Sequence, residues 1–420
     1  MKSVQQNHSK AHFHEGEIRA QRRIGVESKV GTFADQAIRS YMSDQHREFF
    51  ANLPFIVVAA KDHDNRSWVS LLCGEPGFIQ SPDAETLTIC AALGPDDALS
   101  EALEADASIG LLGIMLDARR RNRMNGQIVA NDDGVLQVRV GQSFGNCPQY
   151  ISTRQWLTQA DRATDTPARR SKSLDSRMQQ MIAGADTLFL GTGHLNSTVP
   201  EANGMDASHR GGVASFVSIV SKERLVLPDY AGNKMFNTVG NLLCDPGIGL
   251  LFIDFDSGSI LQLTGHATID WESPVLADYP GARRLIHIDI QACVLIENAL
   301  PIRWQPPSGG MRELRLQSKK AESADITSFV FTPRDGGPLT PFIAGQHLPI
   351  EVRLRSKQSV ARSYSLSGAA DLESYRISVK RLPEGLVSNH LHDHLQPGDT
   401  IPAAPPAGDL YSRMKAAALS

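Results

Sequence analysis

The residues best suited to hold an anionic group lie in segment 231–243, where Gly232-Asn233-Lys234 precedes a run of apolar residues. These apolar residues recur at helical spacing, so the segment predicts a short helix that opens with the glycine, the asparagine and the lysine. A helix that begins there brings free backbone N–H groups and one ammonium group together, and helix N-termini bind phosphate in this way. We therefore expect the segment to bind an anionic cofactor.

A second group of cationic side chains forms the run 119–123, which reads Arg-Arg-Arg-Asn-Arg. The run alone predicts a solvent-exposed basic turn between two strands. The alternative is that some of its guanidinium groups bind a cofactor phosphate or an anionic substrate, because a planar guanidinium can hold such a group through two hydrogen bonds. Segment 142–150 follows, with small polar residues suited to close backbone approach. Its Cys147 has no base beside it in the sequence, so a buried structural cysteine is predicted rather than a reactive thiol.

His12 and His14 form a His-Phe-His pattern that could bind a metal ion, but no third ligand lies nearby in the sequence. We therefore predict no metal site, and we expect residues 1–34 to form a surface arm that packs on the following domain. The five cysteines are scattered, with no Cys-x-x-Cys pair. This pattern favours reduced thiols in a cytoplasmic protein without a zinc or iron–sulfur site.

The elements that must position these residues are mostly strands. Segment 205–271 alternates short apolar runs with breaks rich in glycine, proline and aspartate, which is typical of strands joined by tight turns. It predicts a small antiparallel barrel. Earlier in the chain, Ser43 is predicted to cap a helix, and strands are expected at 55–60, 68–73 and 86–90.

The same order of elements occurs twice. Residues 109–117 mirror residues 248–256, and the register continues without a gap until Asn125-Gly126 faces Thr264-Gly265. This self-similarity predicts an internal duplication, with two related barrels in tandem. Opposite Gly232-Asn233-Lys234 the first copy has Gly94-Pro95-Asp96-Asp97, whose two carboxylates would repel a phosphate. We expect the first copy to lack an equivalent anion site.

Several motifs of the second copy together resemble the pyridoxamine 5'-phosphate oxidase-like family of flavin-binding split barrels. They are Ser208-His209-Arg210-Gly211-Gly212, Pro228-Asp229-Tyr230, Gly232-Asn233-Lys234, Gly240-Asn241-Leu242 and the pair Gly249-Leu250-Leu251-Phe252 with Leu263-Thr264-Gly265. The resemblance covers about residues 175–305 and implies FMN bound between two subunits. It implies that Arg210 and Lys234 bind the phosphate. It further implies contacts to the cofactor from Ser208, His209, Gly211, Tyr230, Asn233, Thr238 and Asn241. For Arg303-Trp304 a packing pair at a strand end and a flavin contact both stay open.

Near the C-terminus, Arg362-Ser363-Tyr364-Ser365 and the later segment 385–393 resemble the FAD-binding barrel of the ferredoxin reductase family, and of flavohaemoglobins in particular. The resemblance implies a Greek-key barrel in which Arg362 pairs with the FAD pyrophosphate. Tyr364 would stack on the isoalloxazine, and Ser363 and Ser365 would lie beside it. Val387 and Ser388 would lie at a helix N-terminus that faces the pyrophosphate.

The sequence after Tyr411 holds no glycine-rich turn that follows a strand, so we expect the hydride-donor site to be missing from this chain. Electrons would then come from a separate NAD(P)H-dependent reductase or a ferredoxin partner. This expectation leaves two functions open. The first is a flavin-dependent oxidoreductase that uses FMN, with FAD as a second candidate, on a small-molecule substrate. The second is a flavin-binding electron-transfer scaffold. A split barrel that binds haem or a biliverdin-like ligand is a weaker third reading.

The composition limits the classes of protein to which this chain could belong. The chain has 420 residues, a formal net charge of -4 and 41% hydrophobic residues, as ordinary globular proteins have, and no long basic run suggests nucleic acid as a partner. No apolar stretch is long enough for a signal peptide or a membrane span. The predicted fold is mainly β with short helices, in three domains: 1–160, 175–305 and 312–412. Linkers are expected at 160–176 and 305–310, and a homodimer is expected from the barrel resemblance.

Overall fold

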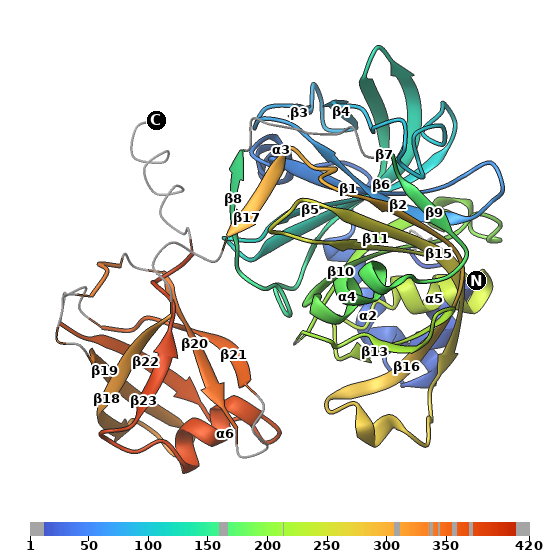
Figure 1. Ribbon diagram of the computed structural model, residues 1–420. Helices are drawn as coiled ribbons and strands as arrows, with labels where there is room; N and C mark the ends of the chain where they lie inside the picture. Colours follow the sequence, from blue (N-terminus) through green and yellow to red (C-terminus); the bar gives the residue numbers. More distant parts are fainter. Residues whose placement is uncertain are drawn as a thin grey trace, which may run out of the picture. The chain divides into compact units, whose positions relative to one another are not determined.

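The computed structural model describes residues 12–158, 167–212, 214–305, 311–334, 336, 339–342, 345–354, 359–368 and 373–408 (Figure 1). The chain divides into two compact units. The first unit comprises Met1–Met115, Arg120–Ser152 and Trp156–Trp304, and the second comprises Leu116–Arg119, Thr153–Gln155 and Gln305–Ser420. Parts of both predicted linkers, 160–166 and 306–310, lie outside the described residues, as do the first eleven residues and the end of the predicted third domain.

The fold is mainly β, as predicted, and its first sheet is antiparallel with the order β2-β1-β5-β6-β7-β4-β3. Its strands are β1 (Phe55–Lys61), β2 (Ser67–Cys73), β3 (Ile79–Gln80), β4 (Thr86–Cys90), β5 (Ser108–Met115), β6 (Arg120–Asp132) and β7 (Val135–Asn146). Helix α3 (Asp44–Ala51) precedes them, and the side chain of Ser43 accepts a hydrogen bond from the His46 N–H at its start, so the predicted cap is confirmed. Phe49, Phe50 and Leu53 pack into the core of this sheet.

The second sheet has the order β11-β10-β14-β15-β16-β13-β12. Its strands are β10 (Thr187–His194), β11 (Gly204–Gly211), β12 (Ser218–Ser221), β13 (Arg224–Tyr230), β14 (Gly247–Ile253), β15 (Ile260–Asp270) and β16 (Ala282–Ile296). Its helices are α4 (Ser176–Gly184), α5 (Asn237–Cys244), and the short 3₁₀ helices η1 (Pro200–Ala202) and η2 (Leu276–Asp278). Strand β9 (Arg169–Ser171) pairs with β16. The predicted linker 160–176 is therefore wrong for residues 169–171, which complete the edge of a sheet.

The two sheets repeat the same strand order position by position, which confirms the predicted tandem barrels. In the first, Ile109 pairs with Gly126, and in the second Ile248 pairs with Gly265. Each copy also has a bulge directly before that glycine, where the register to the following strand shifts. A shared register and a shared bulge are the marks of a duplicated unit rather than of two unrelated sheets.

Glycines at equivalent places let the two copies pack closely. A side-chain carbon at Gly110 of β5 would lie 2.7 Å from backbone atoms of β11, and one at Gly249 of β14 would lie 2.7 Å from the Trp68 backbone of β2. Strand β5 of the first copy thus contacts the second copy, and β14 of the second contacts the first. The copies form one compact unit through this reciprocal contact.

The N-terminal arm packs on the domain that follows it, as predicted, and also on the second copy. It forms α1 (Glu15–Arg23) and α2 (Glu27–Ala37). A side-chain carbon at Gly16 of α1 would collide with the carbonyl oxygen of Gly240 in α5, so the two helices cross in close contact. Residues of α2 join Phe13, Phe144 and Met235 in one apolar cluster. In this way the arm spans both copies.

The second unit is a six-stranded antiparallel barrel with the order β21-β20-β23-β18-β19-β22. Its strands are β18 (Arg312–Ala321), β19 (Ile326–Pro333), β20 (His347–Arg353), β21 (Ser359–Ser365), β22 (Tyr375–Lys380) and β23 (Thr400–Ala403), with helix α6 (Leu386–Asp393). A bridge between Leu366 and Ile377 connects the two outer strands and closes the ring. The remaining strands of the chain, β8 (Gln155–Thr158) and β17 (Ile302–Gln305), pair with each other. None of the described helices is both long and apolar enough to cross a membrane.

Candidate functional site

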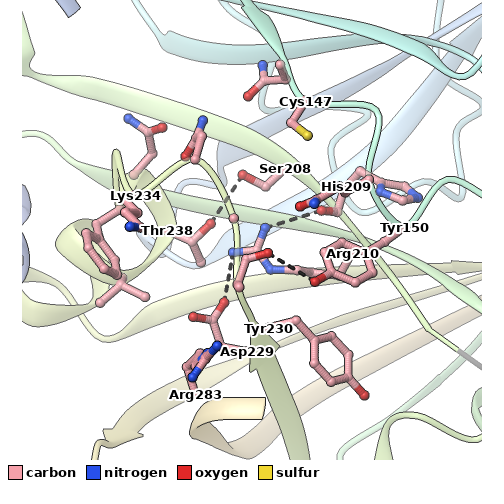
Figure 2. A pocket seen from close by; sticks show the side chains of 18 of the residues that line it. Cys147, Tyr150, Ser208, His209, Arg210, Asp229, Tyr230, Lys234, Thr238 and Arg283 are labelled. Atoms are coloured by element: carbon pink, nitrogen blue, oxygen red, sulfur yellow. Dashed lines mark hydrogen bonds and ion pairs between the residues drawn. The ribbon is translucent and has the colours of Figure 1, made fainter. Parts of the chain in front are cut away.

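A pocket of about 650 Å³ lies in the first unit, where the two copies meet (Figure 2). This volume falls within the range of about 300–1,000 Å³ that is usual for cofactor sites. The first copy contributes the end of β7 and two side chains of β6, the second copy contributes β11, β13 and α5, and the arm contributes Arg23 and Ile24. Cationic side chains dominate its wall: Arg23, Arg121, Arg123, Arg210, Lys234, Arg283 and Arg284, against the carboxylates of Asp229 and Glu272.

Helix α5 begins later than predicted, and this moves the anion-binding backbone. Its first residue is Asn237, so Gly232-Asn233-Lys234 lies in the preceding loop and not in the first helical turn. Lys234 and Phe236 both have left-handed backbone conformations, with φ of 66° and 67°, which delays the helix. Phe236 at the N-cap gives α5 no side-chain cap. The uncapped first turn, Asn237 to Val239, lines the pocket beside Lys234.

The arginine run does not form the exposed turn that the charge pattern predicts. Strand β6 begins at Arg120, and side chains alternate along a strand. Arg121 and Arg123 therefore point to the same side and line the pocket, while Arg120 lies over the ring of Phe49. Arg123 is 5% exposed. The alternative reading, in which part of the run serves an anion site, fits the structure.

Buried positive charge in this pocket exceeds the buried negative charge that could balance it. Burial, together with the neighbouring Arg210 and Arg123, lowers the pKa of Arg121 to about 10. The Nε atoms of Arg121, Arg123 and Arg210 and the Nη1 atom of Arg284 are buried and have no hydrogen-bond partner. Buried donors are normally satisfied, so such a group of donors indicates an anionic ligand.

Asp229 joins the cations from two strands. Its carboxylate lies 3.5 Å from Arg210 and 3.3 Å from Arg284, and it is 7% exposed. Arg284 in turn lies over the rings of Phe236 and Trp271. Asp229 therefore holds two guanidinium groups at the pocket wall without neutralising both of them.

Aromatic rings form a flat surface at the pocket mouth. The rings of Tyr150 and Tyr230 stack with centroids 5.5 Å apart and planes 25° apart. Burial raises the pKa of Tyr230, so its hydroxyl stays protonated. Tyr150 also donates a hydrogen bond from its hydroxyl to the carbonyl oxygen of Ala231, which ties segment 142–150 to the loop before α5. A planar ring system of a ligand would find an apolar face here.

A buried polar network lies behind the pocket. Arg123 donates to the carboxylate of Asp206 at 3.1 Å and to Ser208 Oγ, and Thr238 Oγ1 donates to the same Ser208 at 3.2 Å. Asn241 donates to Asp206 at 2.8 Å. This network fixes β6, β11 and α5 relative to one another, and so it positions the residues that line the pocket.

The structure brings most of the predicted FMN residues together. Those that line the pocket are Ser208, His209, Arg210, Gly211, Tyr230, Asn233, Lys234 and Thr238. Asn241 does not line it and belongs to the network behind. Arg303 donates to the carbonyl oxygens of Leu300 and Ile302, and Trp304 packs against Phe55 and Phe255, so this pair follows the packing alternative.

Other pocket residues were not predicted from the sequence. Arg23 and Arg284 carried no motif, although Arg283-Arg284 before a strand is a visible cationic pair. Cys147 is exposed and lines the pocket, so its prediction as a buried structural cysteine was wrong. The preceding Asn146 ends β7, and the chain leaves the sheet there, which exposes the thiol.

The corresponding segment of the first copy, 94–97, ends in a buried carboxyl group. Asp97 is 5% exposed and accepts hydrogen bonds from Ser70 Oγ, the Leu99 N–H and Gln262 Nε2. Burial raises the pKa of its carboxyl. A buried carboxyl group thus stands in the segment that the sequence sets opposite Gly232-Asn233-Lys234.

In the second unit, the predicted FAD residues lie on two elements of one barrel. Arg362, Ser363, Tyr364 and Ser365 lie on β21, which pairs along its length with β20. Burial raises the pKa of Tyr364 to about 12. Val387 and Ser388 are buried in the first turn of α6, whose N-cap Gly385 gives no side-chain cap. Uncapped N–H groups at this helix end fit an anionic group such as a pyrophosphate.

The family match found by comparison with known proteins lies in the second unit. Residues 313–411 match the family model described as oxidoreductase FAD-binding domain. The flavohemoprotein of Pseudomonas aeruginosa is 46% identical over 104 residues, which are 25% of this chain and 26% of that protein. The chain thus spans about a quarter of the length of this curated relative.

Two solved structures illustrate the likenesses found. The flavohem-like FAD/NAD binding domain of a nitric oxide dioxygenase from Vibrio cholerae is 40% identical, with a TM-score of 0.23, over 24% of this chain and 45% of that chain. A putative pyridoxamine 5'-phosphate oxidase from Lactobacillus delbrueckii is 12% identical, with a TM-score of 0.24, over 29% of this chain and 94% of that chain. Residues 313–411 are an oxidoreductase FAD-binding domain, and the chain therefore carries a flavin-dependent oxidoreductase module.

Proposed function

We propose that the pocket between the two copies binds FMN and that the protein is a flavin-dependent oxidoreductase with two flavin sites. The observation that supports FMN is the group of buried guanidinium donors without partners, placed beside the uncapped N-terminus of α5. A phosphate group would satisfy these donors and balance the buried charge. The stacked Tyr150 and Tyr230 offer a face for a planar ring system.

Different residues would bind different parts of FMN. Arg210, Lys234 and the first turn of α5 would bind the phosphate, with Arg121 as a further cation from the first copy. Ser208 and Thr238 hydrogen-bond each other at the pocket wall and would orient the phosphate ester. When bound, FMN would supply electron or hydride transfer at its isoalloxazine ring.

For the second unit, we propose that FAD binds to β21 and the N-terminus of α6. Arg362 would pair with the pyrophosphate, Tyr364 would stack on the ring system, and Ser363 and Ser365 would hydrogen-bond near it. Val387 and Ser388 would present first-turn N–H groups to the pyrophosphate. The match of residues 313–411 to an oxidoreductase FAD-binding domain supports this assignment.

The substrate of the FMN site would be a small molecule, which follows from the pocket volume of about 650 Å³. We further propose that electrons come from NAD(P)H through a reductase or from a ferredoxin. The tandem copies enclose the pocket within one chain, and so they would supply what a homodimer of single barrels supplies in related folds.

The test begins with the absorption spectrum of the purified protein, followed by denaturation and chromatography of the released cofactors. We expect one FMN and one FAD per chain. Steady NAD(P)H oxidation by the purified chain alone would count against an electron-transfer scaffold, and it would also overturn the proposed need for a separate reductase or ferredoxin. A colourless protein that fails to take up added FMN would overturn the FMN assignment. Release of haem would indicate that the pocket binds haem and not FMN.

A further inference from the structure

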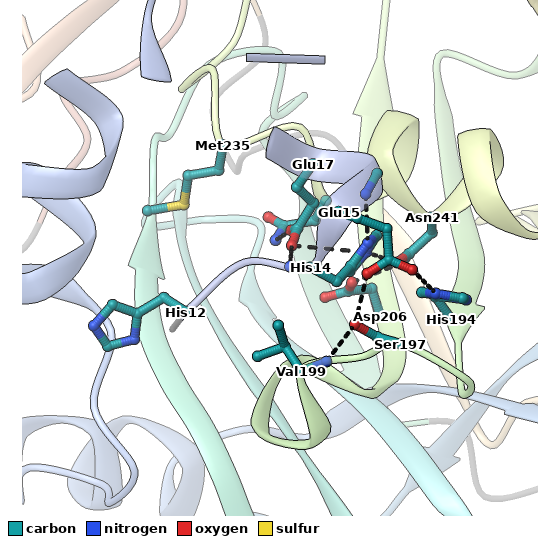
Figure 3. A network of polar contacts seen from close by, with 12 residues as sticks. His12, His14, Glu15, Glu17, His194, Ser197, Val199, Asp206, Met235 and Asn241 are labelled. Carbon is teal, nitrogen blue, oxygen red and sulfur yellow. Dashed lines mark hydrogen bonds and ion pairs between the residues drawn. The ribbon is translucent and has the colours of Figure 1, made fainter. Parts of the chain in front are cut away.

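We propose that His14, His194 and Cys244 form a zinc site that joins the N-terminal arm to the second copy (Figure 3). One ligand atom from each of the three side chains lies within 4.8 Å of the other two. The residues come from three elements: the N-cap of α1, the end of β10 and the end of α5. The site lies outside the proposed flavin pocket, and nothing in the argument for FMN depends on it.

Close packing of the arm is what brings the three side chains together. A side-chain carbon at residue 16 would lie 2.6 Å from the Cys244 sulfur and 2.9 Å from the His14 ring, so only glycine leaves room there. His14 is 2% exposed and His194 is 9% exposed, with ring centroids 5.0 Å apart. Cys244 is half-buried, so its thiol is not fully closed off from solvent.

The hydrogen bonds of His14 fix which of its nitrogens carries a lone pair. Asn241 donates through Nδ2 to Asp206 and to Thr192, so its oxygen Oδ1 must accept. That oxygen lies 2.8 Å from His14 Nε2, which is therefore protonated. His14 Nδ1 then holds the lone pair, and it accepts a bond from the Gly16 N–H. A metal ion would take over this acceptor.

His194 has the same arrangement. Its Nε2 lies 2.8 Å from the Glu15 carboxylate, whose other oxygen accepts from Ser197, and this places the proton on Nε2. Metal-binding histidines usually donate their other N–H to a carboxylate or carbonyl oxygen, which fixes the tautomer and raises the basicity of the ligand nitrogen. Both imidazoles are held in this way before any ion binds.

The ligand set favours zinc. Two imidazole nitrogens and one thiolate are the ligands that zinc prefers, with a water molecule in the fourth position. Tetrahedral zinc, with bonds of about 2.0 Å to nitrogen and about 2.3 Å to sulfur, sets its ligand atoms about 3.4 Å apart. Side-chain shifts of about 1 Å would bring the three residues to that spacing.

The experiment measures zinc binding to the full chain after treatment with a chelator. We expect one zinc per chain, and Co²⁺ in its place should give a thiolate-to-cobalt charge-transfer band. Cys244→Ser and His194→Gln should each weaken zinc binding by at least about 100-fold, which exceeds the effect of losing an outer hydrogen-bond partner.

The matched controls are Cys90→Ser in β4 and His394→Gln in the second unit, two exposed residues that are not part of the cluster and should leave zinc affinity unchanged. FMN content is measured on every variant, because the FMN and zinc assignments can then fail separately. Zinc binding that is absent from the wild-type chain, or that survives both ligand substitutions, overturns the proposal. A cobalt complex without the charge-transfer band does so as well, because it excludes Cys244 as a ligand.

Discussion

Arg121 is partly buried, with Arg210 and Arg123 as neighbouring cations, and its contacts explain why the first copy matters to the pocket. It donates to His209 Nδ1 at 2.8 Å, and its Nε has no hydrogen-bond partner. No described salt bridge involves Arg121. A guanidinium in this position costs stability in the flavin-free protein, because it is desolvated among like charges. Binding of the proposed FMN phosphate would offset this cost.

Arg121→Leu should therefore lower the affinity for FMN without lowering the stability of the flavin-free protein. We expect the flavin-free variant to be as stable as the wild type or more stable, while FMN affinity falls about 10- to 100-fold, as for the loss of a charge-assisted hydrogen bond. Fluorescence titration gives the affinity and thermal unfolding gives the stability. Arg120→Leu is the control, because Arg120 lies on the opposite face of β6 and should not change FMN affinity. Loss of stability together with unchanged affinity would contradict the assignment.

Asp97 gives a pH dependence of defined sign. Its carboxyl has a raised pKa in the folded protein, so the folded chain keeps a proton that the unfolded chain releases above the ordinary value of 3.8. The contribution of Asp97 to stability is thus largest below that pH and falls as the pH rises toward the raised pKa. Asp97→Asn mimics the protonated carboxyl and should remove this fall.

The measurement for Asp97 is the difference in melting temperature between variant and wild type across pH. We expect no difference in acid and a more stable variant at neutral pH. A variant that is less stable at neutral pH would show that Asp97 is ionised in the folded protein.

At the level of elements, the contact between the two copies depends on Gly249. A methyl group there would lie within 2.8 Å of backbone atoms of Ser67 and Trp68, which cannot move aside as a flexible side chain can. Gly249→Ala should destabilise the first unit by about 1–3 kcal/mol through overpacking. Gly31→Ala in α2 has open space around it and should stabilise by about 0.5–1 kcal/mol.

Urea unfolding followed by tryptophan fluorescence measures these two changes. All four tryptophans, Trp68, Trp156, Trp271 and Trp304, belong to the first unit, so the signal reports on that unit. Equal stability of Gly249→Ala and the wild type would show that the copies separate at this contact without cost.

The sequence predicted the repeated strands well because alternation and turn residues are local signals. It predicted the duplication because two sheets with the same strand register have the same number of residues between paired positions, as at Ile109 and Ile248. It placed the start of α5 too early, since the left-handed conformations of Lys234 and Phe236 leave no mark in helical spacing. A run of like charges does not show which alternate residues of a strand face inward, so the inward side chains of Arg121 and Arg123 could not be predicted from the sequence. Ligands from distant segments, such as His194 and Cys244 beside His14, are set by tertiary packing.

At the level of the whole molecule, the two proposed flavin sites lie on separate units and should lose their cofactors independently. Arg121→Leu should lower the FMN content and leave FAD at one per chain, whereas Arg362→Ala should lower FAD and leave FMN. Chromatography of cofactors released from the two purified variants measures both contents. Loss of both flavins in either variant would show that the sites are coupled or that one of them is misassigned. The proposed division into three domains and the oligomeric state stay predictions.

The packing of α1 against α5 also has a consequence for folding during synthesis. Gly16 leaves the ribosome long before Gly240, its contact in α5. At about 5–20 residues per second, the arm waits about 10–45 seconds for its partner helix to be made. The first copy can fold during that interval, while Phe13 and the apolar face of α2 have no complete surface to cover them. The nascent chain should therefore need a chaperone, or the delay itself, most at the moment when the second copy is still incomplete.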